Sequence, residues 1–209
     1  MTNLLNKEDI RRALQDQPFK NLLGHYPTEL LSGSPRPAAV LIPLVCTNAG
    51  WQVLFIRRTE VEGDLHSGQV ALPGGRRDRK DESLTATALR ETQEELGIMP
   101  DDIEILGQLN EFIAISNYRV TPFVGTLAWP YPIVPDAREV AHWFTIPLGW
   151  LQDENNRRTE MRILPNGRGD VSVIYFERYQ GELLWGLSAR IITELLTVIS
   201  SRQSAARRR

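Results

Sequence analysis

The sequence predicts an α+β fold, arranged as a three-layer α/β/α sandwich. Runs of branched apolar residues recur along the chain, as expected for strands. Two helical patterns accompany them, one ending just before Gly97 and one covering residues 187–200. Polar, proline-containing segments at residues 31–37 and 129–137 separate these parts, as turns and loops do.

Composition sets the limits within which a function must be sought. A chain of 209 residues with 42% hydrophobic and 24% charged residues is typical of a globular protein with one sizeable domain. The formal net charge of −2 gives no drive toward nucleic acid or an anionic membrane, so we expect neither as a partner. The amino terminus lacks the apolar stretch of a signal peptide, which predicts a cytoplasmic protein. The single cysteine, Cys46, is expected to be a small core residue.

Three segments are expected along the chain. Residues 1–34 are predicted to form a helical extension, because Ile10 and Leu14 stand at helical spacing within an amphipathic helix over 7–16. Residues 35–201 are predicted to form the main domain. Residues 202–209 are expected to be a disordered basic tail.

Strands are predicted in order along the main domain. Residues 38–47 and 51–59 are separated by Asn-Ala-Gly, which favours a hairpin. Further strand patterns follow the acidic helix, and a closing helix carries an apolar stripe of Ile191, Leu195 and Val198. These later strands are expected within 102–112, 118–129, 140–151 (running into a short helix) and, as a pair around a turn, 171–186.

The helix that ends before Gly97 carries three carboxylates in its last turn, Glu91, Glu94 and Glu95. A helix C-terminus has partial negative charge, so each costs about 0.3–1 kcal/mol. Their spacing of three and four residues places them on one face, where like charges repel. Two interpretations stay open: a divalent cation lies between the carboxylates, or the face is solvated with Arg90 paired to Glu94.

The segment before this helix favours the cation. Gly74 and Gly75 have no Cβ, so their backbone can approach a ligand closely. A divalent cation at this junction would take carboxylate and carbonyl oxygens and leave positions for water and phosphate. The sequence therefore predicts a site able to hydrolyse a diphosphate.

The same residues resemble a known family. The run Arg-Glu-Thr-Gln-Glu-Glu-Leu-Gly at 90–97 is similar to the Nudix box, which is a glycine, an acidic residue and then R-E-x-x-E-E-x-G. Thr92 stands where the box usually has an aliphatic residue. Either Asp81 or Glu82 fills the first acidic position, because the interval from Gly75 to Arg90 is one residue longer than usual.

That longer interval resembles the coenzyme A diphosphatase-like branch, in which Pro-Gly-Gly is followed by D-x-x-D and T-A-L-R-E. Asp78, Asp81 and residues 87–91 match this pattern. The branch's upstream signature is similar to the stretch from Arg58 through residues 66–75, but its arginine shortly before Gly68 is missing. The resemblance covers roughly residues 38–200.

The resemblance implies a mixed β-sheet with a central Nudix helix, and it implies roles for individual residues. Glu91, Glu94 and Glu95 would hold Mg²⁺ or Mn²⁺ with the Gly75 carbonyl, and Arg90 would orient the carboxylates. The general base is expected to be Glu95, Asp81 or Glu139, although Asp81 or Ser83 could instead cap the helix and Glu139 could be a surface residue. Substrate contacts are expected from Arg58, His66, Gly74, Gly75, Ser116 and Tyr118.

Three functions follow as hypotheses. The leading one is hydrolysis of coenzyme A or a derivative to 3',5'-adenosine bisphosphate and 4'-phosphopantetheine. The second keeps the chemistry but takes ADP-ribose or another nucleoside diphosphate derivative, which the missing arginine favours. The third is a non-catalytic nucleotide-sensing module, which would be expected to lose the metal carboxylates that this chain retains. The resemblance also suggests a homodimer.

Overall fold

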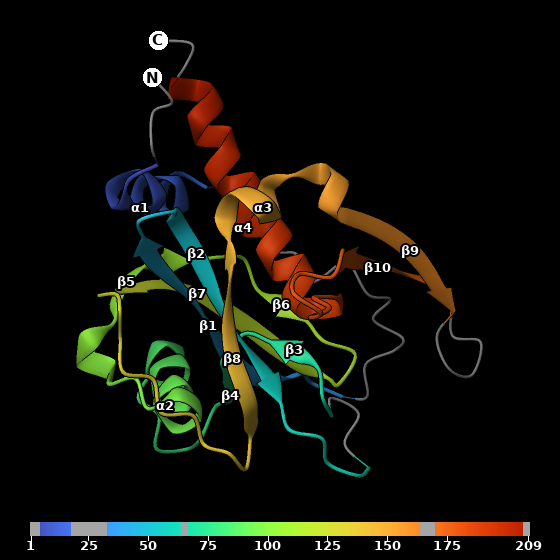
Figure 1. Cartoon of the computed structure of the whole chain (residues 1–209). Coiled ribbons are helices and arrows are strands. Elements are labelled where there is room, and N and C mark those ends of the chain that lie inside the picture. Colours follow the sequence, from blue (N-terminus) through green and yellow to red (C-terminus); the bar gives the residue numbers. More distant parts are fainter. Residues whose placement is uncertain (1–4, 18–32, 64–66, 164–169, 207–209) are drawn as a thin grey trace.

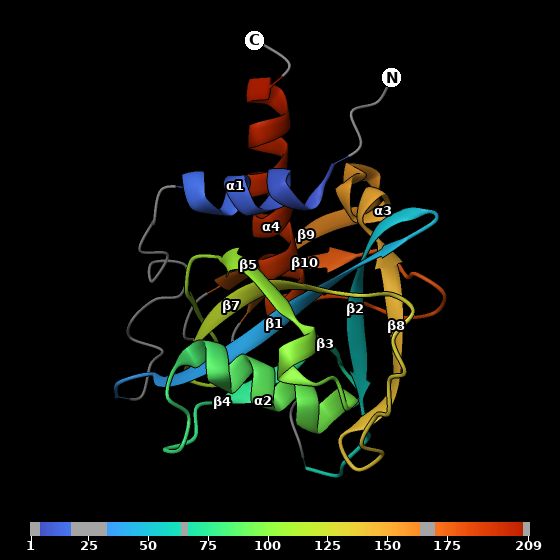
Figure 2. The ribbon, with the colours of Figure 1, turned by 90° about the vertical axis from the view of Figure 1, so that its left-hand side faces the viewer.

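A mixed β-sheet lies between helices, as the sequence predicted (Figures 1 and 2). The computed structural model describes residues 5–17, 33–63, 67–163 and 170–206. Its helices are α1 (Lys7–Asp16), α2 (Leu84–Leu96), α3 (Leu148–Gln152) and α4 (Gly186–Ala206), with 3-10 turns η3 (Pro100–Asp102) and η4 (Glu154–Asn156). Its strands are β1 (Arg36–Thr47), β2 (Gly50–Arg58), β3 (Val70–Ala71), β4 (Gly74–Arg76), β5 (Glu104–Gln108), β6 (Phe112–Ile113), β7 (Tyr118–Leu127), β8 (Val140–Pro147), β9 (Arg157–Ile163) and β10 (Asp170–Phe176).

The large sheet is organised around β1. Its strands follow the order β3-β2-β1-β7-β5, while β4 also pairs with β1, β6 with β7 and β8 with β2. The predicted β1–β2 hairpin is confirmed, with Thr47 opposite Gly50 at its turn. β1 and β7 run parallel, and the other described pairings in this sheet are antiparallel.

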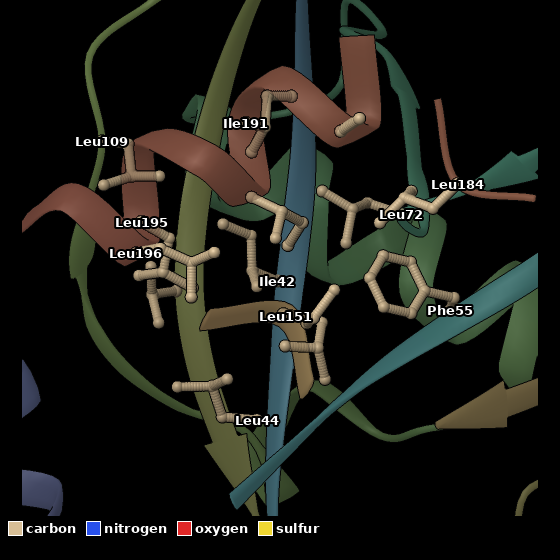
Figure 3. Close-up of a cluster of buried hydrophobic side chains, with 14 of the residues drawn as sticks. Ile42, Leu44, Phe55, Leu72, Leu109, Leu151, Leu184, Ile191, Leu195 and Leu196 are labelled. Carbon is tan, nitrogen blue, oxygen red and sulfur yellow. The ribbon is translucent and has the colours of Figure 1, made fainter. Parts of the chain in front are cut away.

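The alternation of side chains along β1 fills two cores, one on each face of the sheet. Ile42 and Leu44 belong to the cluster that α1 and α4 cover, shown in Figure 3. Leu41 and Val45 belong to the cluster beneath α2. Figure 2 shows the layers, with α2 below the sheet and α1 and α4 above it. Each fully buried aliphatic side chain contributes about 1.5–3 kcal/mol, so the sheet is held rigidly from both sides.

The predicted helix over residues 7–16 is confirmed as α1. A capping box between Asn6 and Asp9 starts it, and Ile10 and Leu14 are buried in the α4-side core. α1 therefore packs as part of the α4 layer. No helix among the described residues is long and apolar enough to cross a membrane.

Several expectations about individual residues were wrong. α4 continues as a helix to Ala206, five residues into the segment expected to be a disordered tail. The expected stripe of Ile191, Leu195 and Val198 does face the core, where Val198 packs half-buried at its margin and the neighbouring Ile199 is fully buried. Cys46 is exposed, because it stands at the end of β1 beside the hairpin turn.

The strand pair expected within 171–186 is also only partly present. β10 forms, but the segment after it makes only isolated bridges, Tyr179 to Glu182 and Tyr175 to Trp185. The ladder partner of β10 is β9, and the two form a separate hairpin at the side of the molecule (Figure 1). β9 lacks an apolar alternation and six of its seven side chains are exposed, so its pattern gave no strand signal.

Candidate active site

α2 has clear start and stop signals. Ser83 caps its N-terminus, where its Oγ accepts a hydrogen bond from the Ala86 N–H at 3.1 Å. Gly97 ends it in the left-handed conformation at φ 67°. Thr92, in the place of the usual aliphatic residue, is fully buried and its hydroxyl donates to the Ala88 carbonyl at 2.7 Å. The helix is thereby fixed against β1 with its carboxylates at one end.

Gly74 presents its backbone to these carboxylates. Its N–H donates to Glu95 Oε2 at 2.9 Å. Its φ is 149°, and a Cβ at this position would clash with the Ala39 carbonyl oxygen, so no side chain fits here. Glycine is required here because the strand must lie this close to β1.

The register of β4 determines which glycine carbonyl faces the site. Bonds from Leu41 N–H to the Pro73 carbonyl and from Arg77 N–H to the Pro37 carbonyl flank the pair Ala39–Gly75. Because hydrogen-bonded and non-hydrogen-bonded pairs alternate in an antiparallel ladder, Gly75 bonds to β1 while the N–H and C=O of Gly74 face the free edge. The geometry thus favours the carbonyl of Gly74, rather than the expected Gly75, as a ligand.

Gly75 matters for a different reason. A Cβ built on it lies 2.5 Å from Glu91 Oε2, so the Glu91 carboxylate occupies the space that any side chain would need. The two glycines of the Pro-Gly-Gly segment therefore bring one strand against both Glu91 and Glu95.

Glu95 is a buried carboxylate whose negative charge is only partly balanced by the groups around it. Its side chain is 1% exposed, and its described cation partner, Arg58, places Nη1 3.5 Å from Oε1. Burial, together with the charges of Glu91 and Glu139, raises the pKa of Glu95 to about 8. The described groups around Glu95 therefore supply too little positive charge to keep its carboxylate ionised at neutral pH.

Glu91 shares this environment. Burial raises its pKa, and the neighbouring charges of Glu94 and Glu139 add to the shift, although Arg90 Nη2 lies 2.8 Å from Glu91 Oε1 and opposes it. Glu94 is exposed and pairs with Arg90 Nη1 at 2.7 Å. Glu139 is exposed, yet close enough for its charge to act on the buried Glu95 and the half-buried Glu91. Glu139 is therefore a surface residue, as one alternative had it, and its role as general base stays a prediction.

Arg90 joins these carboxylates to the loop before the helix. Its Nε lies 2.9 Å from Asp81 Oδ1, and its Nη2 donates to the Arg76 carbonyl at 3.2 Å. The pKa of Arg90 is raised chiefly by its hydrogen bond to Asp81. These contacts support the expected orienting role.

Asp81, a candidate general base, is bound on both oxygens. Arg90 donates to both, and the Thr87 hydroxyl and Asp78 N–H reach Oδ2 at 2.9 and 2.8 Å. The hydrogen bond from Arg90 holds the pKa of Asp81 well below its usual range. Ser83 is the helix cap, and Glu82 is exposed. Asp81 therefore fixes Arg90 and is poorly placed to take a proton.

The remaining predicted site residues divide into two groups. Arg58 lies with the carboxylates. Among the described contacts, none joins Ser116 or Tyr118 to the carboxylates; Ser116 stands in the turn before β7, and Tyr118 begins β7 opposite Arg36 on β1. His66 lies outside the described residues.

The oxygen donors of the site suit a divalent cation by their chemistry, although the described side chains are not already assembled around one. Among the described residues, no three histidine, cysteine or carboxylate side chains are already grouped as metal ligands. Arg90 and Arg58 hold the glutamates in ion pairs instead. The chemistry nevertheless fits a hard cation, because oxygen donors converge on one edge and two of the carboxylates have raised pKa values.

Comparison with known proteins agrees with the fold. Residues 35–164 match the family model of the NUDIX domain. A protein named Uncharacterized Nudix hydrolase NudL from Pectobacterium atrosepticum is 39% identical over 168 residues, which are 80% of this chain and 84% of that one. Its namesake from Yersinia pestis is 36% identical over 191 residues, 91% of this chain and 92% of that one.

The fold and the carboxylate helix thus define a hydrolase of phosphoanhydride bonds. The chain belongs to the Nudix family and is a Nudix pyrophosphohydrolase. The crystal structure of a MutT/nudix family protein from Enterococcus faecalis shares the fold, with a TM-score of 0.52 and 19% identity over 95% of this chain and 76% of that one.

Proposed function

We propose that this enzyme hydrolyses the diphosphate bond of coenzyme A or a derivative, giving 3',5'-adenosine bisphosphate and 4'-phosphopantetheine. The observation that carries the proposal is the loop between Gly75 and Arg90, which is one residue longer than in the ordinary Nudix box. The two aspartates that match the coenzyme A branch close this loop, because Asp78 N–H donates to Asp81, which in turn binds Arg90.

Glu91, Glu94 and Glu95, with the Gly74 carbonyl, would hold Mg²⁺ or Mn²⁺. When bound, the cation neutralises the diphosphate and acidifies a water molecule. The chain's own groups position this donor set: Arg90 holds Glu91 and Glu94, while Gly74 N–H holds one oxygen of Glu95.

Among the three candidate bases, we favour Glu139. The Glu95 carboxylate is 1% exposed and accepts a backbone N–H, and both Asp81 oxygens are occupied. Glu139 is exposed and its charge acts on Glu91 and Glu95, so a water molecule can reach its carboxylate close to both. Glu139→Gln should lower kcat, whereas an unchanged kcat would exclude this role.

The test is a substrate panel. Purified protein with Mg²⁺ or Mn²⁺ is given coenzyme A, acyl-coenzyme A, ADP-ribose and NADH, and the products are separated by chromatography. Coenzyme A should yield 3',5'-adenosine bisphosphate. Turnover of ADP-ribose without turnover of coenzyme A would overturn the proposal and establish the second candidate, which the missing signature arginine near Gly63 favours. The cytoplasmic location and the homodimer stay predictions.

A further inference from the structure

Two arginines from different strands lie on one face of the sheet, at the end next to the glycines of the site. Arg76 ends β4 opposite Ala38 of β1, and Arg36 begins β1 two residues before Ala38. Because alternate residues share a face, Arg36 and Arg76 are diagonal neighbours, with Cβ atoms about 7–8 Å apart, within reach of long side chains. We call Arg36 and Arg76 the basic rim.

The basic rim carries charge that the described part of the chain does not neutralise. Both residues are exposed, and neither forms an ion pair with a described carboxylate. The Arg36 guanidinium lies over the Tyr118 ring, 4.2 Å from its centre, which orients the group but leaves its charge in place. By contrast, Arg58 and Arg90 beside the carboxylates are ion-paired.

The acidic residues Asp78 and Glu111 make their described contacts with residues other than Arg36 and Arg76. Asp78 accepts the Lys80 N–H, and Glu111 accepts the Thr121 hydroxyl and faces Arg119 at 3.8 Å. Arg119 is on the opposite face of β7 from Tyr118, because adjacent residues of a strand alternate. Two neighbouring like charges repel on a sheet, so an anion between Arg36 and Arg76 would relieve the repulsion.

The basic rim is held at a fixed distance from the site. Arg76 stands two residues beyond Gly74, which is about 7 Å along a strand. The Arg76 carbonyl accepts Arg90 Nη2 at 3.2 Å, so the end of β4 is tied to the catalytic helix. Arg77 donates to the Asp81 carbonyl at 3.0 Å and secures the following loop.

We infer that the basic rim binds a second, non-scissile phosphate of the substrate, a monoester on the nucleoside such as the 3'-phosphate of coenzyme A. This inference rests on the proposed function and deepens it. Guanidinium groups bind phosphate through paired N–H donors, and a phosphate monoester supplies enough charge for two of them. ADP-ribose lacks such a group, so the basic rim would select coenzyme A against it.

The experiment compares coenzyme A with 3'-dephospho-coenzyme A. With Mg²⁺, wild-type kcat/KM should be about tenfold or more higher for coenzyme A. Arg36→Gln/Arg76→Gln should remove this preference, mainly by raising KM for coenzyme A, and leave the dephospho substrate unaffected. Arg12→Gln is the matched control, an exposed arginine on α1 with the same charge change. Equal loss on both substrates, or no preference in the wild type, would overturn the inference.

A second measurement separates this inference from the proposed function. Adenosine 3',5'-bisphosphate and 5'-AMP are compared as ligands by calorimetry, which needs no turnover. Tighter binding of the bisphosphate, lost in Arg76→Gln alone as well as in the double variant, supports the basic rim even if coenzyme A is not hydrolysed. Equal binding of the two nucleotides would reject it even if coenzyme A is the substrate.

Discussion

The two ends of the catalytic helix differ in how far neighbouring donors balance the charge of a buried carboxylate. Asp81, before the helix, is 8% exposed and receives donors from Arg90, Thr87 and Asp78, so its pKa is lowered. Glu95, in the last turn of the helix, is 1% exposed. It accepts the Gly74 N–H and lies 3.5 Å from Arg58 Nη1, and burial raises its pKa to about 8. The protein neutralises the first carboxylate itself and leaves the charge of the second largely uncompensated.

The largest effect should be on turnover, when the poorly balanced charge of Glu95 is removed. Glu95→Gln is expected to lower turnover by roughly 10²–10⁴-fold, because the variant loses a negatively charged ligand. Its metal-free melting temperature should nevertheless rise at pH 8, since a buried charge is removed. Steady-state kinetics and calorimetry test the two halves. Glu82→Gln, an exposed carboxylate before the helix, is the control; comparable activity in both variants would contradict the assignment.

Disrupting the compensated end should have the opposite effect on stability. Asp81→Asn should lower the free energy of unfolding by roughly 1–3 kcal/mol, because Arg90 and Thr87 lose a charged acceptor. Turnover should also fall, since Arg90 holds Glu91 and Glu94. Urea unfolding measures the loss. A variant as stable as the wild type would show that Asp81 is not compensated as described.

A substitution at Gly75 should have a smaller effect, because it moves the Glu91 carboxylate without removing its charge. Gly75→Ala places a Cβ 2.5 Å from Glu91 Oε2, the end of a flexible side chain, so Glu91 should move while the fold persists. We expect turnover to fall roughly tenfold and the free energy of unfolding to change by less than about 1 kcal/mol. Kinetics and urea unfolding together test this. A large loss of stability with full specific activity would reverse the interpretation.

Without metal, the stability of the protein should also depend on pH. The pKa of Glu95 is raised from 4.5 to about 8 on folding, so between these values the folded protein holds a proton that the unfolded chain releases. This contribution to stability is present below pH 4.5 and is lost as pH rises through 8. The melting temperature should therefore fall over this range more in the wild type than in Glu95→Gln. Parallel curves would contradict the shifted pKa.

The carboxylate end was predictable from sequence because its signal is local. Three glutamates in one helical turn, after two glycines, conflict with the helix dipole, and that conflict is visible in a single stretch. The compensated end was not predictable, because the role of Asp81 depends on Arg90 nine residues away folding back over the loop. Asp81 and Glu82 looked equivalent in the sequence and differ completely in burial.

In the fold, too, the elements set by local patterns were predictable and the pairings between distant strands were not. The β1–β2 hairpin and α1 followed from local patterns. The pairing of β9 with β10, the side to which the Gly74 backbone points and the approach of Arg36 to Arg76 all depend on register between separate strands. The run Arg76–Lys80 was the available signal for the basic rim, but only the pairing of β1 and β4 brings Arg36 beside it.

Binding of Mn²⁺ followed by calorimetry at pH 7, in buffers of different ionisation enthalpy, tests the central claim most directly. If the C-terminal end of α2 is a cation site, wild-type binding should release close to one proton, because Glu95 is largely protonated without metal. Glu95→Gln should bind more weakly and release almost none. Binding of equal affinity in both proteins, with no proton release in either, would contradict the account.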